Sequence, residues 1–324
     1  MRSVALLFLL ILLLTGCTIQ NTPAATGTSP GSAPQSTSIN LPTEENASIL
    51  FDDFSYSARD EMTANGWVIR SQAGWPGIPG ASFRPENVTF VDDVQGVANR
   101  LLRMTSSTGG TGGNTFQTQI CHRRKYLEGT YAARVYFSNR PVAGADGDQV
   151  VETFYAITPY EGPLRPDYSE MDFEYLPNGG WGLRPMTIAF TTWETVRIEP
   201  WQADNASDSV SADMEGWQTL VLQAMDGRVR YFINGSPVGE HSGNYYPDAR
   251  MSINFNLWFI DGGLIDSNEI RSYQEDIDWV FHAAGEVLSP RAVEQKIQSL
   301  REAGVKFLDA VPDGTPVLPS PCDL

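Results

Sequence analysis

The chain has 324 residues, of which 39 are acidic and 22 are basic, so its formal net charge at neutral pH is −17. This excess of negative charge repels nucleic acid and anionic lipid head groups, and we expect no nucleic-acid partner. A neutral polymer as the substrate remains compatible with this negative charge.

The N-terminus has the composition of an export signal. Arg2 precedes the apolar run Val4–Leu14, which is too short to span a bilayer as a stable helix and is typical of the centre of a signal peptide. The run closes with the letters LTGC, which resemble the lipobox at which bacterial prolipoproteins are lipidated and cleaved. Residues 1–17 are therefore expected to direct export and to leave a lipid on Cys17 that anchors the protein to a membrane, at the cell surface or in the periplasm. The alternative is an ordinary cleaved signal peptide with an incidental cysteine.

Two stretches of different composition follow. Residues 18–48 consist mainly of Thr, Ser, Pro, Ala, Gly and Asn without apolar periodicity, so they cannot bury enough apolar surface to fold and are predicted to form a disordered tether. From residue 49 to residue 284, short alternating runs are separated by Gly, Pro, Asn and Asp, as in an all-β sandwich. This length suits one large domain.

The alternation is clearest in two segments of this domain. Every second side chain of residues 131–137 is apolar, which predicts a strand with one buried face. Residues 229–233 alternate in the same way, and the Asn234-Gly235 pair after them tolerates the positive φ of a type I′ hairpin turn, with a returning strand at residues 238–241. Many such strands without a helical period exclude a parallel βαβ fold and predict two packed antiparallel sheets, one of them curved into a groove.

Residues 285–324 form a further segment of different composition. Ser289 and Pro290 are typical of the first positions of a helix, apolar residues follow at helical spacing, and Gly304 is typical of a helix end. The sequence predicts a short C-terminal helical appendage. The remainder, residues 311–324, is rich in proline and is expected to run over the surface.

The cysteines leave two alternatives open. With Cys17 acylated, Cys121 and Cys322 remain, and an even pair in an oxidising compartment can form one disulfide. The other alternative is two free thiols, because the sequence does not show whether the two Cα atoms approach each other.

Three acidic residues at alternating positions are the candidate catalytic residues. In the segment SEMDFEYLPN, Glu170, Asp172 and Glu174 alternate with apolar residues, so in a regular strand the carboxylates share one face while the apolar set packs into the core. Like charges at that spacing resist joint ionisation, and at least one carboxyl is expected to keep its proton near neutral pH. Glycoside hydrolysis needs such a pairing of an acid with a base. The alternative is a solvated acidic strand face.

The segment resembles the active-site strand of glycoside hydrolase family 16, in the form without a bulge that occurs in bacterial lichenases and plant xyloglucan transglycosylases. YLEGTYAARVYF before it, and MSINFNLWFIDGG and EDIDWVFH after it, resemble lichenase strands in order and spacing. The resemblance covers residues 51–282. It implies a jelly-roll sandwich of the concanavalin A-like type, a polysaccharide as partner and no cofactor for catalysis, and we expect a monomer.

The resemblance also assigns roles to residues. It makes Glu170 the nucleophile, Glu174 the general acid/base, and Asp172 the carboxyl that tunes the nucleophile by sharing a proton. It places Asn256 and Trp258 on the substrate side of their strand, where an amide and a flat aromatic ring complement the hydroxyl edges and C–H faces of a sugar. For Trp258, partial burial in the core is the alternative.

Other aromatic residues are further candidates for sugar contacts. Trp75 lies in a Gly/Pro-rich loop, near a position where lichenases hold the sugar, and its alternative role is to anchor that loop. Phe154, Tyr155 and Trp181 flank the acidic strand and are weaker candidates than Trp75.

Two more positions concern metal binding and specificity. Asp278 matches an acid that binds structural calcium in lichenases, with a backbone oxygen near Asp53 as the second contributor, and a solvated Asp278 is the alternative. Gln119 and Cys121 stand in a strand where lichenases carry an acid and an Arg near the substrate. Because of this departure, the specificity of lichenases for a glucan linkage does not transfer to this chain.

The expected function is hydrolysis of a β-glucan-type polysaccharide by an endo-acting, retaining enzyme. A transglycosylase, which passes the glycosyl-enzyme to a sugar hydroxyl, uses the same acids and is the first alternative. A non-catalytic carbohydrate-binding lipoprotein is the second, although a pure binder has no need to crowd three carboxyls against their desolvation and mutual repulsion.

Overall fold

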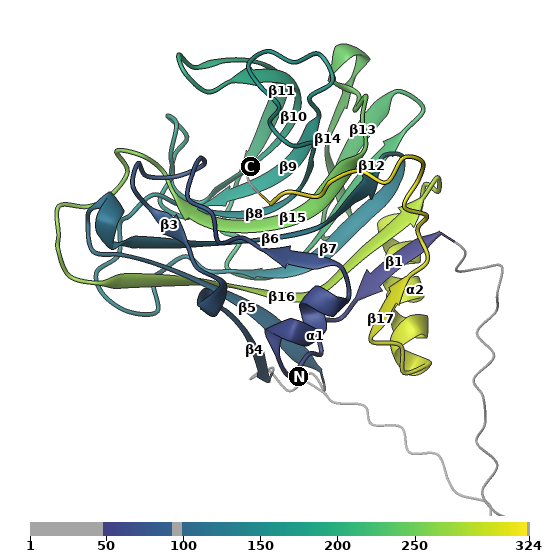
Figure 1. Cartoon of the computed structure of the whole chain (residues 1–324), viewed down its shortest axis with the longest axis horizontal. Coiled ribbons are helices and arrows are strands. Elements are labelled where there is room, and N and C mark those ends of the chain that lie inside the picture. The colour runs from purple at the N-terminus through teal and green to yellow at the C-terminus, as the bar shows by residue number, and fades with distance from the viewer. Residues whose placement is uncertain (1–47, 93–98, 323–324) are drawn as a thin grey trace, which may run out of the picture. The chain divides into compact units, whose positions relative to one another are not determined.

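The computed structural model describes residues 48–92 and 99–322. The expected export signal, Cys17 and nearly all of the expected tether lie outside these residues. The described chain forms two packed sheets of mainly antiparallel strands (Figure 1), which is the predicted all-β jelly-roll sandwich. No helix in the part of the chain that the structure describes is long and apolar enough to cross a membrane.

One sheet carries the three acids, and we call it the acid-bearing sheet. In spatial order it consists of β2 (Trp67–Ile69), β6 (Thr115–Tyr126), β15 (Met251–Phe259), β8 (Val150–Ile157), β9 (Glu170–Leu176), β10 (Thr187–Arg197) and β11 (Gln202–Ser211). Its long strands curve, as Figure 1 shows. The acids lie on the face that points away from the second sheet, because Met171 and Phe173 between them are buried in the core. The expectation of a curved sheet is therefore confirmed.

The second sheet closes the other side of the core. It consists of β4 (Val88–Asp92), β5 (Arg100–Thr108), β16 (Arg271–Ala284), β7 (Gly129–Phe137), β12 (Gly216–Met225), β13 (Arg228–Ile233) and β14 (Ser236–Ser242), with β1 (Ile49–Asp52) and β17 (Phe307–Asp309) beside one end of β16. β6 joins the sheets, because it pairs with β5 and runs parallel to β3 (Ser82–Phe83).

The core between the sheets follows the predicted alternation. Tyr131, Val135 and Phe137 of β7 are fully buried, because successive side chains of a strand point to opposite faces. The predicted hairpin is also present, since Asn234 and Gly235 both have positive φ, 49° and 80°, between β13 and β14.

The predicted C-terminal helix is α2 (Pro290–Glu302), and it covers the outer face of the second sheet. The Ser289 hydroxyl accepts a hydrogen bond from the amide of Ala292 at 3.2 Å and caps the helix. The apolar side of α2 packs on Phe51 and Phe281, so burial against the sheet stabilises this short helix. The shorter helices, which the sequence did not indicate, are α1 (Arg59–Ala64), η1 (Pro85–Asn87), η2 (Gly112–Asn114) and η3 (Gly243–Tyr245).

The chain after β17, residues 310–322, is here called the C-terminal tail. It leaves the second sheet and runs to the acid-bearing sheet (Figure 1), where Cys322 forms a disulfide with Cys121 of β6. Of the two alternatives for the cysteines, the structure has the disulfide. The bond links positions 201 residues apart and fixes the end of the tail on β6.

Candidate active site

The three acids lie side by side on β9. Met171 and Phe173, between them, are fully buried in the core, so Glu170, Asp172 and Glu174 point to the outer face. Strands β8 and β10 pair with β9 on its two sides and hold it in the middle of the sheet. The acids therefore stand on a rigid element.

Hydrogen bonds from neighbouring groups orient two of the acids. Asp172 is 2% exposed and accepts hydrogen bonds from the Thr191 amide at 2.9 Å and from the Trp193 indole nitrogen at 2.7 Å. Glu170 accepts a hydrogen bond from the Tyr168 hydroxyl. Each of these donors favours the ionised form of the carboxyl that it contacts.

Burial opposes ionisation throughout the group. Desolvation raises the pKa of Asp172 to about 7, although the hydrogen bonds from Trp193 and Thr191 lower it. Desolvation and the charge of Asp172 raise the pKa of Glu170 well above its usual range, against the hydrogen bond from Tyr168. For Glu174, desolvation and both neighbouring carboxyls raise the pKa. The group therefore retains protons near neutral pH, as the sequence predicted.

The acids face a small cavity of about 40 Å³. The predicted site residues that line it are Glu170, Asp172, Glu174, Trp75, Asn256 and Trp258, and they are joined by Thr153 and Tyr155 of β8. These residues come from β9, β8, β15 and one loop, and they surround a single space beside the acids.

A series of contacting indoles spans the cavity, and we call it the indole roof: Trp193, Trp201, Trp75 and Trp258. The ring centroids of Trp193 and Trp201 are 6.1 Å apart, those of Trp201 and Trp75 are 6.2 Å apart, and those of Trp75 and Trp258 are 6.4 Å apart. Trp193 lies on β10 and Trp258 on β15, with β9 and β8 between these strands. The series therefore runs from the β10 side of the acids to their β15 side, and Trp75 and Trp201 contribute to it from two loops.

Polar groups form the floor beside the acids. The Gln119 amide donates to the Tyr155 hydroxyl at 2.8 Å and accepts from the Arg70 guanidinium at 2.6 Å. Asn256 is 1% exposed, and its Oδ1 atom has no hydrogen-bond partner within residues 48–92 and 99–322. A buried acceptor that lines a cavity and lacks a donor fits a ligand hydroxyl.

The structure corrects one aromatic candidate and supplies others. Phe154 lies in the core with its ring stacked on Phe255 at 5.3 Å, so its expected place beside the substrate is wrong: Tyr155 takes the outer face of β8. Trp181 is 54% exposed and contacts Trp258 at 5.7 Å. Among residues not predicted, Tyr168 precedes Glu170 by two positions, and continuing the alternation upstream would have found it.

The surroundings of Asp278 do not fit calcium. Its fully buried carboxylate accepts hydrogen bonds from Arg134 at 2.5 Å, Arg301 at 2.6 Å and Asn99 at 2.7 Å. Although burial alone would raise the pKa of Asp278, Arg301 and the other donors lower it. The carboxylate of Asp53 accepts the Ser55 amide at 3.0 Å. Two guanidinium groups already supply the positive charge beside Asp278, so the expected calcium site, formed by Asp278 and a backbone oxygen near Asp53, is not supported.

Comparisons with known proteins give the fold. No protein-family model and no curated protein matches the sequence. Among solved structures, a β-glucanase from Bacillus licheniformis has 14% sequence identity and a TM-score of 0.53, with 73% of this chain and 98% of that chain covered. A family 16 endo-glucanase from Bacteroides ovatus has 14% identity and a TM-score of 0.53, covering 71% and 98%. LamAcat from Zobellia galactanivorans has 13% identity and a TM-score of 0.52, covering 72% and 96%. The chain shares the fold of these three proteins.

Proposed function

We propose that the chain is a retaining glycoside hydrolase of family 16 that cleaves a β-glucan-type polysaccharide. The observation that carries this proposal is the group of three carboxyls on β9, which retain protons near neutral pH below an indole roof. The names of two structural neighbours, a β-glucanase and an endo-glucanase of family 16, support the same substrate class.

The surroundings of the two glutamates support different roles. Burial and neighbouring carboxyls raise the pKa of both glutamates, but only Glu170 also receives a hydrogen bond that lowers its pKa, from Tyr168, and a carboxylate is the form that attacks. For Glu174, burial and both neighbouring carboxyls favour the protonated form, which is the form that donates a proton. This asymmetry agrees with Glu170 as nucleophile and Glu174 as general acid/base.

The reaction then takes two displacements. A carboxylate oxygen of Glu170 bonds to the anomeric carbon while the glycosidic C–O bond breaks, and the proton of Glu174 passes to the leaving oxygen. Glu174, now ionised, takes a proton from water, whose oxygen displaces Glu170 from the anomeric carbon. Asp172 lies between the two glutamates and can share a proton with either. Two inversions at one carbon leave the product in the β configuration.

The remaining residues of the cavity suit a sugar. The rings of Trp75 and Trp258 offer flat apolar surfaces to the C–H faces of a pyranose. The unpartnered Oδ1 atom of Asn256 can accept a hydrogen bond from a sugar hydroxyl. These contacts hold the sugar above the acids, which is the positioning that the first displacement requires.

An azide rescue experiment tests the two roles separately. For the Glu174→Ala variant, an aryl glycoside with a good leaving group should still form the glycosyl-enzyme, and azide should restore turnover and give a β-glycosyl azide. For Glu170→Ala, azide should occupy the space of the lost carboxylate and give the α-glycosyl azide. Products of one configuration from both variants would contradict the assignment. Products longer than the substrate would identify a transglycosylase.

We further propose that the enzyme is exported and anchored outside the cytoplasm by a lipid on Cys17. The sequence around this residue supports the proposal. An exported enzyme is placed where an external polysaccharide reaches it, and an oxidising compartment permits the disulfide between Cys121 and Cys322.

A further inference from the structure

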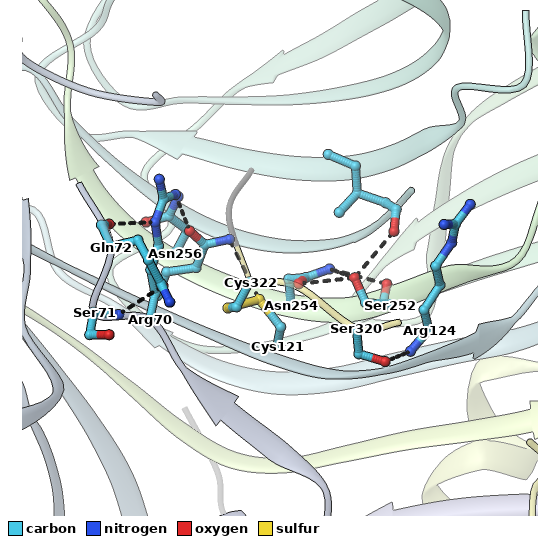
Figure 2. The surroundings of a disulfide bond; sticks show 12 residues. Arg70, Ser71, Gln72, Cys121, Arg124, Ser252, Asn254, Asn256, Ser320 and Cys322 are labelled. Atoms are coloured by element: carbon cyan, nitrogen blue, oxygen red, sulfur yellow. Dashed lines mark hydrogen bonds between the residues drawn. A yellow bond between two sulfur atoms is a disulfide. The ribbon is translucent and has the colours of Figure 1, made fainter. Parts of the chain in front are cut away.

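The C-terminal tail closes the space beside the acids on the β6 side of the sheet. Strand registers align Asp172 of β9, Tyr155 of β8, Asn254 of β15 and Cys121 of β6 in one row across the acid-bearing face. Because neighbouring strands lie about 4.8 Å apart, Cys121 is about 14 Å from Asp172 along this row. Cys121 carries Cys322, whose Cα atom lies 5.6 Å from its own (Figure 2). The C-terminal tail therefore lies on the acid-bearing face of β6, in the same row of residues as Asp172.

The loop that begins at Arg70 covers the next row of residues, which contains Gln119 and Asn256. Gln119 of β6 is opposite Asn256 of β15, and it is fully buried. The guanidinium group of Arg70 contacts Gln119 at 2.6 Å, donates to the carbonyl of Trp75 at 3.0 Å and lies 3.8 Å from the ring centroid of Phe83. The loop that begins at Arg70 thus covers one outward-facing position of β6, and the tail covers the next.

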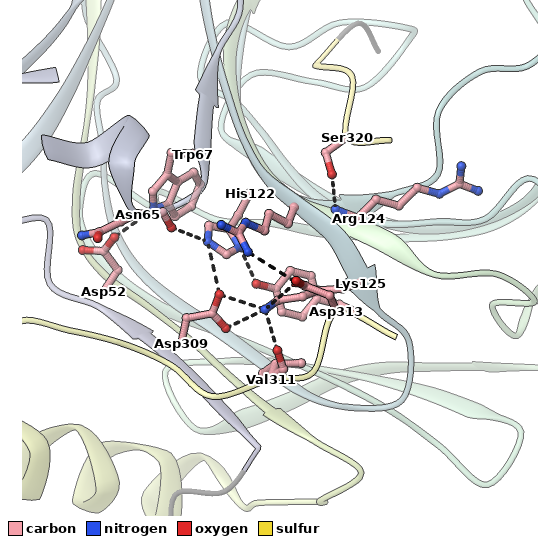
Figure 3. A network of polar contacts seen from close by, with 12 residues as sticks. Asp52, Asn65, Trp67, His122, Arg124, Lys125, Asp309, Val311, Asp313 and Ser320 are labelled. Carbon is pink, nitrogen blue, oxygen red and sulfur yellow. Dashed lines mark hydrogen bonds and ion pairs between the residues drawn. The ribbon is translucent and has the colours of Figure 1, made fainter. Parts of the chain in front are cut away.

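Several contacts fix the course of the tail along β6. Lys125 is 7% exposed and donates to Asp309 at 2.7 Å and to the carbonyl of Val311 at 2.6 Å (Figure 3). Farther along, Arg250 donates to the carbonyl of Pro316 at 2.8 Å, and the backbone amide of Arg124 donates to the Ser320 hydroxyl at 2.8 Å. The tail is therefore attached at successive points before it reaches Cys121.

We propose that the tail and the loop that begins at Arg70 form a blind end of the substrate site, so that the enzyme binds the end of a polysaccharide chain and releases a short product of fixed length. A polymer that crosses the strands over Asp172 meets Cys322 after three strand spacings and can continue only toward β10 and β11. This inference rests on the proposed function, and it replaces the endo action that the family resemblance implies. The tail acts as the specificity determinant.

A truncation of the tail tests the mode of attack. Ending the chain at Pro316 removes Cys322 but keeps β17 and the contacts of Lys125. On a soluble β-glucan, the full-length protein should release one short product, with a slow fall in viscosity for each reducing end formed. The truncated protein should give products of several lengths and an early fall in viscosity. Cys322→Ser should give products and a viscosity curve between those of the two proteins, and Val287→Ala, at a 47% exposed position outside the tail, should behave like the full-length protein.

A binding experiment separates this inference from the proposed function. In the inactive Glu170→Gln background, two β-glucan oligosaccharides are compared by calorimetry, one with a bulky group on its non-reducing end and one with that group on its reducing end. With the tail present, the affinities should differ at least tenfold, because only one end enters the blind site, and truncation should reduce the difference. Equal affinities with the tail present would overturn the blind end alone. Binding of neither ligand would overturn both proposals.

Discussion

Replacing Glu174 by Gln should abolish activity and stabilise the fold at the same time. The amide keeps the size of the side chain but cannot donate the proton to the leaving oxygen, so turnover should fall by about 10²- to 10⁴-fold. The same substitution removes a half-buried carboxyl whose pKa is raised by desolvation and by two neighbouring acids. If Glu174 only supported the fold, the Glu174→Gln variant would be less stable than the wild-type protein.

The size of the effect follows from the pKa shifts in the group. The pKa of Asp172 rises from 3.8 to about 7, and each pH unit corresponds to about 1.4 kcal/mol, so its ionisation opposes folding by about 4 kcal/mol. Single stabilising substitutions commonly contribute up to about 2 kcal/mol, and we expect Glu174→Gln to contribute about 1–2 kcal/mol, well below this penalty. For a domain of this size, the melting temperature should rise by about 2–6 °C.

The pH dependence has a definite sign. A carboxyl with a raised pKa in the folded state binds its proton more tightly than in the unfolded chain, so it lowers stability as the pH rises from the unfolded pKa of about 4.3 through the folded pKa. The advantage of the Glu174→Gln variant should therefore be absent near pH 4 and grow toward pH 8. Thermal unfolding at these pH values measures it. A lower melting temperature of Glu174→Gln than of the wild type at both pH 4 and pH 8 would refute the reasoning. The control is Glu199→Gln, at an exposed position, whose melting temperature should equal that of the wild type.

Two further predictions concern the indole roof and the anchor. Trp201→Ala removes the indole that contacts both Trp75 and Trp193. The KM for the polysaccharide should therefore rise by about tenfold, the effect of roughly 1.4 kcal/mol of lost binding, while the melting temperature stays within the error of the wild-type value. An unchanged KM would contradict a contact between Trp201 and the sugar. Cys17→Ser should move the protein from the detergent phase to the aqueous phase, and retention in the detergent phase would indicate another anchor.

The sequence predicted the features that depend on neighbours along one strand. The outward face of β9 follows from the alternation of three acids with apolar residues, and the hairpin at Asn234-Gly235 follows from two residues that tolerate positive φ. The same alternation placed Asn256 and Trp258 on the outer face of β15. Each of these inferences needs only the local backbone geometry.

Contacts between distant segments could not be predicted in this way. Trp75 and Trp201 meet from loops that are far apart in sequence, and no local pattern relates them. Strand β11 (Gln202–Ser211) lacks an apolar face because it lies at the edge of the sheet, so its sequence does not indicate a strand. Whether Cys322 reaches Cys121 depends on the whole course of the tail.

Arg301 is another case in which a distant segment changes the interpretation of a local motif. The acid at Asp278 suggested calcium, yet α2 brings a guanidinium group to its carboxylate at 2.6 Å. Arg301→Met keeps the aliphatic part of the side chain and removes the charge, so the free energy of unfolding at pH 7 should fall by about 1.5–3 kcal/mol, the range for hydrogen bonds to charged groups. The exposed Arg291→Met on the same helix should change little.

The pKa of Asp278 gives this loss a pH dependence. Because the ion pairs lower that pKa in the folded state, their stabilisation is present above the unfolded pKa of about 3.9 and disappears as the pH falls through the folded pKa. The difference between the wild type and Arg301→Met, measured by urea unfolding, should therefore shrink below pH 4. A chelator should leave the wild-type protein unchanged at pH 7, since arginine supplies the positive charge beside Asp278. A fall in stability on chelation, restored by added calcium, would show instead that a metal ion holds this part of the sandwich together.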